Sequence, residues 1–189
     1  MLLAIDLVQS HRKQRKSARL REYAFLAFCA LVAIGYAELH DQITVRISPG
    51  YFVVAKGARP ARLYSDVALL ALKASYGPGL IAGALLLIVN NPSKRREQLS
   101  YAKLGRLVAL PLIAAGLCAV AGGFVGRYAP PADFVELSSA NFQPDYRQAF
   151  HVVAGIHWGS YVGLCAGTVA AVAVAWRSRA PKVEATIPT

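Results

Sequence analysis

The sequence predicts an all-α membrane protein, a bundle of four transmembrane helices with a short β-hairpin in the first outer loop. Of its 189 residues, 56% are hydrophobic and only 16% are charged, against about 25% charged in a typical soluble domain. The mean hydropathy is +0.40. This composition argues against a water-soluble enzyme and a disordered chain, and three cysteines are too few for a disulfide scaffold. We expect one integral membrane domain over residues 1–189.

Four apolar stretches predict transmembrane helices over residues 23–39, 67–89, 104–128 and 150–176. A helix needs about 20 residues to cross the hydrocarbon core, with a lower limit near 17, so the first stretch is short. The basic N-terminal segment, this short apolar run and the small residues Gly35 and Ala37 near its end also resemble a signal peptide. Cleavage after Ala37 would leave three spans, and both alternatives remain open.

Basic residues are unevenly distributed between the predicted loops. Segment 1–22, loop 90–103 and tail 177–189 contain most of the 21 Lys and Arg residues. The positive-inside rule therefore places both termini in the cytoplasm, with the protein in the inner or plasma membrane. The net charge of +11 is explained by this asymmetry. We expect the basic residues to contact the lipid bilayer and not a nucleic acid.

The two outer loops differ in pattern. In loop 40–66, Ile43–Ile47 alternates apolar and polar residues, Pro49-Gly50 suits a type II turn, and a second apolar run follows from Tyr51. Strand, turn and strand are the natural interpretation. Loop 129–149 begins with Pro130-Pro131 and is polar, so we expect it to be irregular, with at most one helical turn.

Small residues mark one face of the last predicted span. A spacing of four residues places these positions on one side of a helix. Such a stripe, a glycine-zipper pattern, lets a second backbone approach closely in lipid. The partner is either a neighbouring span or a second subunit, as another membrane protein or a homo-oligomer. The stripe consists of Gly155, Gly159, Gly163 and Gly167.

Candidate functional residues gather toward the predicted outer face. His157 lies about two turns inside the last span, and an ionisable group there is a functional candidate by default. Two or three histidines with a carboxylate would suit zinc, copper or iron, and two facing histidines would suit a b-type haem. The metal candidates are His40, Asp41, His151 and His157, and the polar cluster comprises His40, Asp41, Gln42, His157, Ser160 and Tyr161.

Other interpretations of these residues stay open. His157 is also explained as a neutral histidine bonded to a neighbouring helix, or as part of a proton relay with Asp41. A hydrolase with Ser160 as nucleophile and His157 as base is a further alternative, because residues three apart on a helix are neighbours. No HExxH or CxxC motif is present, so the cofactor is unknown and no catalytic residue is assigned.

Two segments resemble a family of uncharacterised bacterial multi-span membrane proteins. Glu38–Phe52 resembles a His-Asp-Gln motif that leads to Pro-Glu-Tyr-Phe, and Ile156–Gly163 resembles Ala-His-x-Ala-Ser-Tyr-x-x-Gly in the last span. This chain departs from the pattern at Gly50, Ile156 and Gly159, and the glycine spacing differs by one residue. The resemblance implies a four-span fold without naming a reaction. The motif positions are His40, Asp41, Gln42, Arg46, Tyr51, Phe52, His157, Ser160 and Tyr161.

Two classes of function follow. The first is a non-catalytic accessory subunit, assembly factor or scaffold, which we favour from the sequence because few charges lie within the spans. The second is a small transporter or a metal- or haem-binding membrane protein that uses the outer cluster. The second class requires His40 or Asp41 within reach of His157, with a cavity between them. Separation of these side chains by packed apolar residues would exclude it.

Overall fold

A computed structural model describes residues 2–93 and 95–181, with side chains described from residue 19 onward. It contains four helices that are long and apolar enough to cross a membrane, at Arg19–Ile47, Pro60–Val89, Tyr101–Tyr128 and Pro144–Arg177. The prediction of a multi-span helical membrane protein is therefore confirmed. Of the predicted tail 177–189, residues 182–189 lie outside the described residues.

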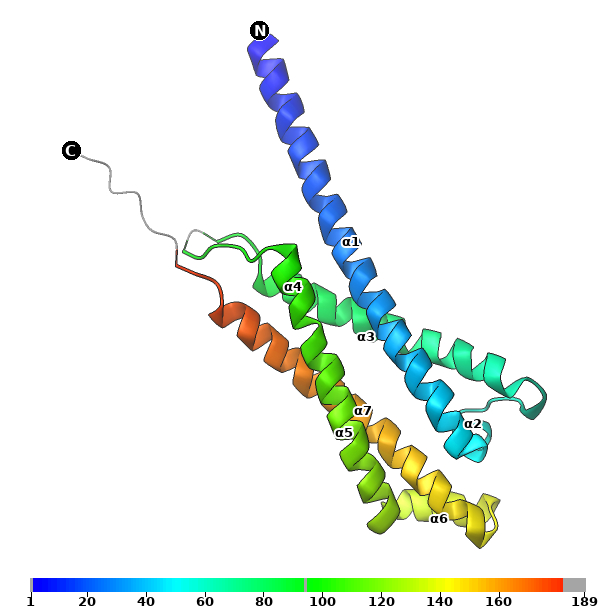
Figure 1. The fold of residues 1–189 in the computed structure, drawn as a ribbon. Coiled ribbons are helices and arrows are strands. Elements are labelled where there is room, and N and C mark those ends of the chain that lie inside the picture. The colour runs from blue at the N-terminus through cyan, green and yellow to red at the C-terminus, as the bar shows by residue number, and fades with distance from the viewer. Residues whose placement is uncertain (1, 94, 182–189) are drawn as a thin grey trace.

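The long helices form two antiparallel pairs (Figure 1). Helix α1 (Leu2–Ile47) packs along α3 (Leu63–Val89), and α5 (Ala109–Tyr128) packs along α7 (Pro144–Arg177). The first pair approaches closely where Gly79 and Gly83 of α3 face Cys29 of α1. Small residues at such crossings let the backbones approach, and this packing is what holds helices together in lipid.

The glycines of the last span face α5 of the same chain. Side-chain methyl groups at these positions would collide with the backbone of α5, in particular with carbonyl oxygens of Cys118 and Gly122. Of the two partners considered from the sequence, the neighbouring span is the one in contact. The residues concerned are Gly155, Gly159, Gly163 and Gly167.

The predicted β-hairpin is wrong. Helix α1 continues to Ile47, and α2 (Pro49–Val54) follows after Ser48; no β-strand occurs in residues 2–93 or 95–181. The Ser48 hydroxyl accepts a hydrogen bond from the Tyr51 N–H, and Pro49 occupies the first turn. Serine and proline are favoured at these two positions. The Ser-Pro-Gly signal that suggested a turn between strands therefore starts a helix.

Several boundaries also differ from the predicted ones. After η1 (Pro60–Arg62), α3 begins earlier than residue 67, and the third span divides into α4 (Tyr101–Leu107) and α5. Pro111 has no N–H to donate to the Leu107 carbonyl, which explains the break at Val108. Loop 129–149 contains α6 (Ala132–Asn141), which is longer than the single turn expected.

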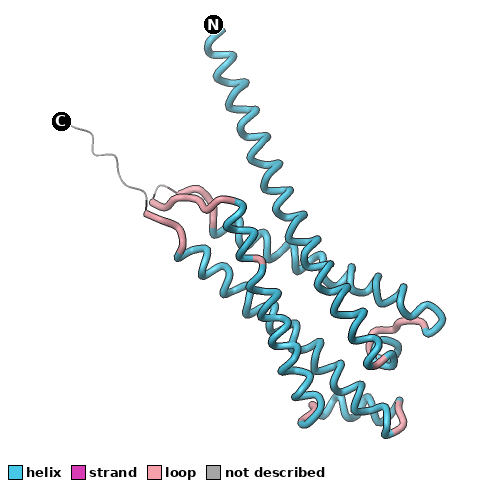
Figure 2. The backbone as a smooth tube through the Cα atoms, in the orientation of Figure 1, coloured by secondary structure: helices cyan, strands magenta, loops and turns pink. Residues whose placement is uncertain are grey.

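The loop between α3 and α4 is tied to the end of α7. The Asn90 side chain accepts from the Leu99 N–H at 2.7 Å and donates to the Leu99 carbonyl at 3.0 Å. Arg179, only 4% exposed, donates to the carbonyls of Asn91 at 2.8 Å and Glu97 at 2.9 Å. These loops lie side by side in Figure 2. The basic tail after α7 thus contributes a structural arginine.

Candidate functional site: a histidine–aspartate cluster

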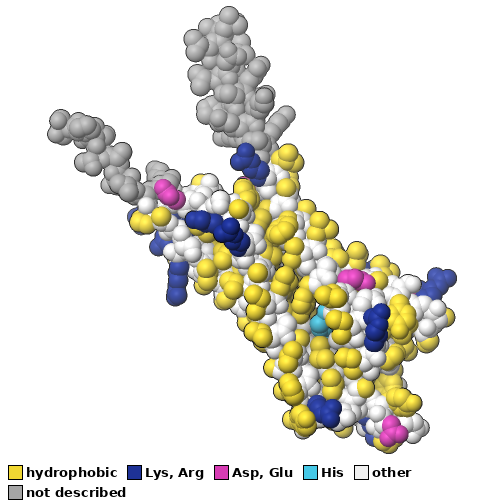
Figure 3. All heavy atoms as spheres, viewed as in Figure 1, with side chains coloured by type: hydrophobic (Ala, Val, Ile, Leu, Met, Phe, Trp, Pro, Cys, Tyr) yellow, Lys and Arg dark blue, Asp and Glu magenta, His cyan; other side chains and the backbone are white. Residues whose placement is uncertain are grey.

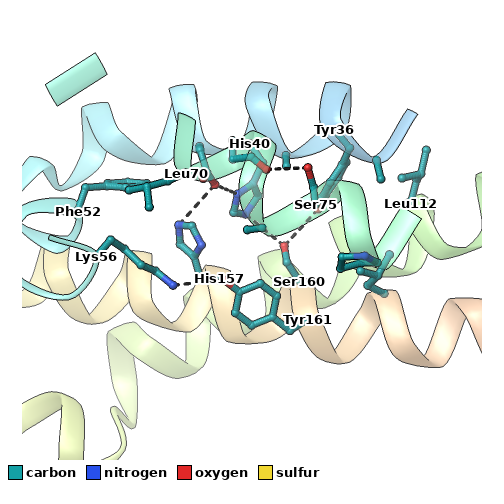
Figure 4. A pocket seen from close by; sticks show the side chains of 17 residues that line it. Tyr36, His40, Phe52, Lys56, Leu70, Ser75, Leu112, His157, Ser160 and Tyr161 are labelled. Atoms are coloured by element: carbon teal, nitrogen blue, oxygen red, sulfur yellow. Dashed lines mark hydrogen bonds and ion pairs between the residues drawn. The ribbon is translucent and has the colours of Figure 1, made fainter. Parts of the chain in front are cut away.

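The candidate site lies where α1 of one helix pair faces α7 of the other (Figure 4). Tyr36, His40 and Thr44 follow one another at four-residue spacing, so they share one face of α1. His157 and Ser160, three residues apart, present the facing side of α7. The extension of α1 through residue 47 is what places Thr44 on this face.

His40, Asp41 and His157 converge. The Nδ1 atom of His40 lies 2.9 Å from Oδ1 of Asp41, and Nε2 of His157 lies 3.8 Å from the same oxygen. Metal-ligating atoms of all three residues lie within 4.8 Å of one another. The His157 side chain is 4% exposed and that of Asp41 is 13% exposed, so the cluster is largely buried.

Hydroxyl groups surround the cluster. The Ser160 hydroxyl lies 3.2 Å from Nε2 of His40 and 3.2 Å from the Tyr36 hydroxyl. The Thr44 hydroxyl lies 3.4 Å from Nε2 of His157 and donates to the His40 carbonyl at 3.0 Å. These contacts orient both imidazole rings, and in the described residues no buried side-chain nitrogen or oxygen lacks a hydrogen-bond partner.

Helix α2 covers the cluster with two aromatic rings. The Tyr51 ring stacks on His157 with a centroid separation of 4.8 Å, and the Phe52 ring meets it edge-on at 5.5 Å. Burial raises the pKa of the Tyr51 phenol well above its usual value, so this ring stays neutral. The segment predicted as a hairpin therefore still closes the site, as a capped helix.

A cavity of ≈ 240 Å³ adjoins the cluster. It lies between the two helix pairs, and histidine atoms are visible on the face shown in Figure 3, bordered by hydrophobic side chains. Besides cluster residues, its walls include Lys56 from the segment after α2 and apolar side chains from deeper in the bundle. The site is thus open to a small ligand.

The sequence-predicted residues divide into two groups. Gln42 donates to Oε1 of Glu38 at 3.1 Å, and His151 is hydrogen-bonded to the Ser138 hydroxyl of α6 at 2.7 Å. Neither residue lines the cavity. The members of the predicted polar cluster that do line it are His40, Asp41, His157, Ser160 and Tyr161, and the motif residue Phe52 lines it as well.

Three residues of the site were missed by sequence reasoning. Thr44 follows His40 by one helical turn, a signal that the expected strand concealed. Tyr36 precedes His40 by one turn and could have been found from the same spacing. Lys56 lies in a loop, and nothing in its local sequence directs it to the last span.

The geometry revises the hydrolase alternative. The hydrogen bond of Ser160 goes to His40, whose other ring nitrogen meets Asp41, so the order of groups follows a serine–histidine–aspartate triad. The backbone N–H of Ser160 lies inside α7, where a helix bonds it to a carbonyl four residues earlier. That N–H is therefore not available to stabilise an oxyanion.

Two imidazoles and a carboxylate fit a divalent transition metal. Zinc–ligand bonds of about 2.0–2.1 Å in a tetrahedron place ligand atoms about 3.4 Å apart. The 2.9 and 3.8 Å separations in the cluster bracket that spacing. If Nδ1 of His40 binds the metal, its Nε2 keeps the Ser160 hydrogen bond, which is the usual support for a metal-bound histidine.

Fold and site together define a four-helix membrane protein with a histidine–aspartate cluster buried between two helix pairs. No protein-family model matches the chain, and no curated protein or solved structure shows significant similarity to it. No family model therefore supports the resemblance of Glu38–Phe52 and Ile156–Gly163 to a membrane-protein family, and the function of the site rests on its geometry.

Proposed function

We propose that this chain binds one divalent transition metal, of the zinc or iron(II) kind, at the site formed by His40, Asp41 and His157. The observation that carries the proposal is the convergence of three ligand atoms within 4.8 Å next to a cavity. Two histidines and one carboxylate with an open position are typical of reactive or exchangeable metal sites, not of closed structural ones. This supports the transporter or metal-binding class over the accessory class.

Equilibrium dialysis of the purified protein in lipid nanodiscs tests this proposal. We expect one zinc or iron(II) ion per chain, and loss of at least about 100-fold in affinity in His157→Gln, because removing a direct ligand should cost more than the 10–100-fold of an outer-shell partner. His151→Gln is the matched control, since His151 is bonded to Ser138. Equal binding by both variants would refute the assignment.

A proton relay is the second candidate, and a specific chain of contacts favours it. Tyr36, Ser160, His40 and Asp41 follow one another through separations of 3.2, 3.2 and 2.9 Å. Such a relay would serve a small proton-coupled transporter. Proton flux into liposomes can be measured for both forms of the protein. A flux that is lower in Ser160→Ala than in the wild type, and that chelators do not change, would favour the relay over the metal.

The accessory-subunit hypothesis and the orientation also remain proposals. Because α5 already covers the glycine face, a partner protein or second copy would have to use another lipid-facing surface. The uneven distribution of Lys and Arg supports cytoplasmic termini in the inner or plasma membrane. Cysteine labelling from either side of the membrane, in Ala61→Cys and Arg177→Cys variants at exposed positions, tests the orientation.

A further inference from the structure

The cavity changes in character along the axis of the bundle. Most of its polar groups lie near α2, whereas its deeper part is mainly apolar; the exception there is Ser75, whose hydroxyl donates to the Ala71 carbonyl at 2.6 Å. At 1.5 Å per residue, Ala33 lies about 10 Å further along α1 than His40. The polar end thus lies nearer the helix ends and the apolar end nearer the middle of the spans, as in a lipid molecule of one leaflet. The deeper walls come from Ala33, Ala74, Pro78, Leu112 and Leu164.

A cation stands at the polar end of this cavity. The Lys56 ammonium donates to the Tyr161 hydroxyl at 3.3 Å and lies 5.6 Å from the Tyr51 ring centroid. Among the residues from 19 onward that the structure describes, no carboxylate lies within 4.0 Å of it. Figure 4 shows its side chain directed toward Tyr161 at the edge of the site. The ammonium therefore has donor capacity left for a ligand.

We propose that the cavity binds a single-chain anionic amphiphile, with its carboxylate or phosphate headgroup at Lys56 and its chain along the apolar walls. The volume of ≈ 240 Å³ exceeds the roughly 150 Å³ that accommodates benzene in an apolar protein cavity. The positive charge of Lys56 favours an anionic headgroup. Because the cavity walls change from polar to apolar toward the middle of the spans, the ligand should lie parallel to the surrounding lipid molecules.

The Asp41 carboxylate opposes an anion, and this makes a further prediction. A divalent ion at His40, Asp41 and His157 would reverse the local charge, so a bound metal should strengthen headgroup binding. That one step rests on the proposed function. The inference itself does not, because Lys56 and the apolar walls are independent of the metal.

The test measures binding of radiolabelled decanoate to the protein in phosphatidylcholine nanodiscs with a chelator present, against empty nanodiscs. We expect one saturable site, displaced by decyl phosphate as well as by decanoate. Decanol and acetate should each compete at least tenfold more weakly, because one lacks the charge and the other the chain. Equal competition by decanol would overturn the inference.

Variants assign the two ends of the ligand. Lys56→Gln should weaken decanoate binding at least tenfold and Lys56→Arg should largely retain it, whereas Lys73→Gln removes an exposed lysine outside the cavity and should change nothing. Ala74→Leu changes a residue that lines the cavity and should block its apolar part, whereas Ala173→Leu changes a residue outside the cavity and is the control. Wild-type affinity in both Lys56→Gln and Ala74→Leu would contradict the inference.

Adding zinc after the metal-free measurements separates the two proposals. Tighter decanoate binding with zinc, absent in Asp41→Asn, supports both of them. An unchanged affinity, with the preference for decanoate over decanol intact, supports the amphiphile site and counts against the metal. Loss of that preference in metal-free protein counts against the amphiphile site whatever zinc does.

Discussion

The imidazole rings of His40 and His157 meet edge to face, with centroids 4.7 Å apart at an interplanar angle of 86°. They belong to helices of different pairs and are separated by more than half of the chain. Asp41 contacts both rings through one carboxylate oxygen. This relationship meets the geometric condition that the metal or relay class requires, and the first two predictions below follow from it.

Asp41→Asn should abolish the stabilisation of the protein by zinc without unfolding metal-free protein. A ligand at 100 times its Kd stabilises the folded state by about 2.7 kcal/mol, so zinc should raise the wild-type melting temperature. The amide keeps the shape of the carboxylate but supplies no charge. Thermal unfolding with and without zinc checks this, with Asp145→Asn, an exposed aspartate, as the control. A full zinc-induced shift in Asp41→Asn would show that the carboxylate is not a ligand.

Ser160→Ala should weaken metal binding by about 10–100-fold, the usual cost of losing an outer-shell partner of a metal-bound histidine. The Ser160 hydroxyl lies 3.2 Å from Nε2 of His40, where it orients the ring. Thr168→Val is the control, because the Thr168 hydroxyl donates only to the Leu164 carbonyl of its own helix. Competition with a chromophoric chelator measures the affinities, and equal losses in both variants would argue for a non-specific effect.

Gly155→Ala should destabilise the α5–α7 pair by about 1–3 kcal/mol, the usual cost of overpacking. The added methyl group would collide with the Gly122 carbonyl. Backbone atoms of a helix cannot move aside to relieve this collision as the end of a flexible side chain can. At Gly116, where no atom lies within 4 Å of an added Cβ, the same substitution should stabilise the helix by about 0.5–1 kcal/mol. Unfolding midpoints in mild detergent compare the two, and destabilisation of similar size at both positions would contradict the packing account.

Arg179→Met should loosen loop 90–100 and destabilise the protein by at least about 1.5–3 kcal/mol, the value of one hydrogen bond to a charged group. The guanidinium reaches several carbonyls of this loop, including those of Asn91 and Glu97. Limited proteolysis should cut the variant within the loop. Arg177→Met, which changes an exposed arginine, should remain resistant, and a resistant Arg179→Met would show that Asn90 holds the loop alone.

The four long helices could be predicted from the sequence because each apolar stretch approaches the length of a bilayer crossing. The β-hairpin could not be excluded in the same way. Alternation over Ile43–Ile47 is too short to distinguish strand from helix, and a serine followed by proline starts a turn or a helix with equal ease. The side-chain cap of Ser48 on Tyr51 decides for the helix.

The candidate site was only partly predictable. His40, Asp41 and His157 stood out because ionisable residues near or inside a span are unusual. Their convergence depends on the packing of α1 against α7, which hydropathy does not encode, and the same reason hid Lys56. The partner of the glycine stripe was equally open, because a smooth helix face fits any close backbone until the fold brings α5 against it.

The most direct test of the metal site is X-ray absorption spectroscopy on protein that has been loaded with zinc and then dialysed to remove the unbound ion. The account predicts one zinc per chain, a first shell of nitrogen and oxygen at about 2.0–2.2 Å, and the outer-shell scattering of two imidazoles that falls to one in His157→Gln. A sulfur shell near 2.3 Å, which would point to the cysteines, or no retained zinc at all would contradict the assignment to His40, Asp41 and His157.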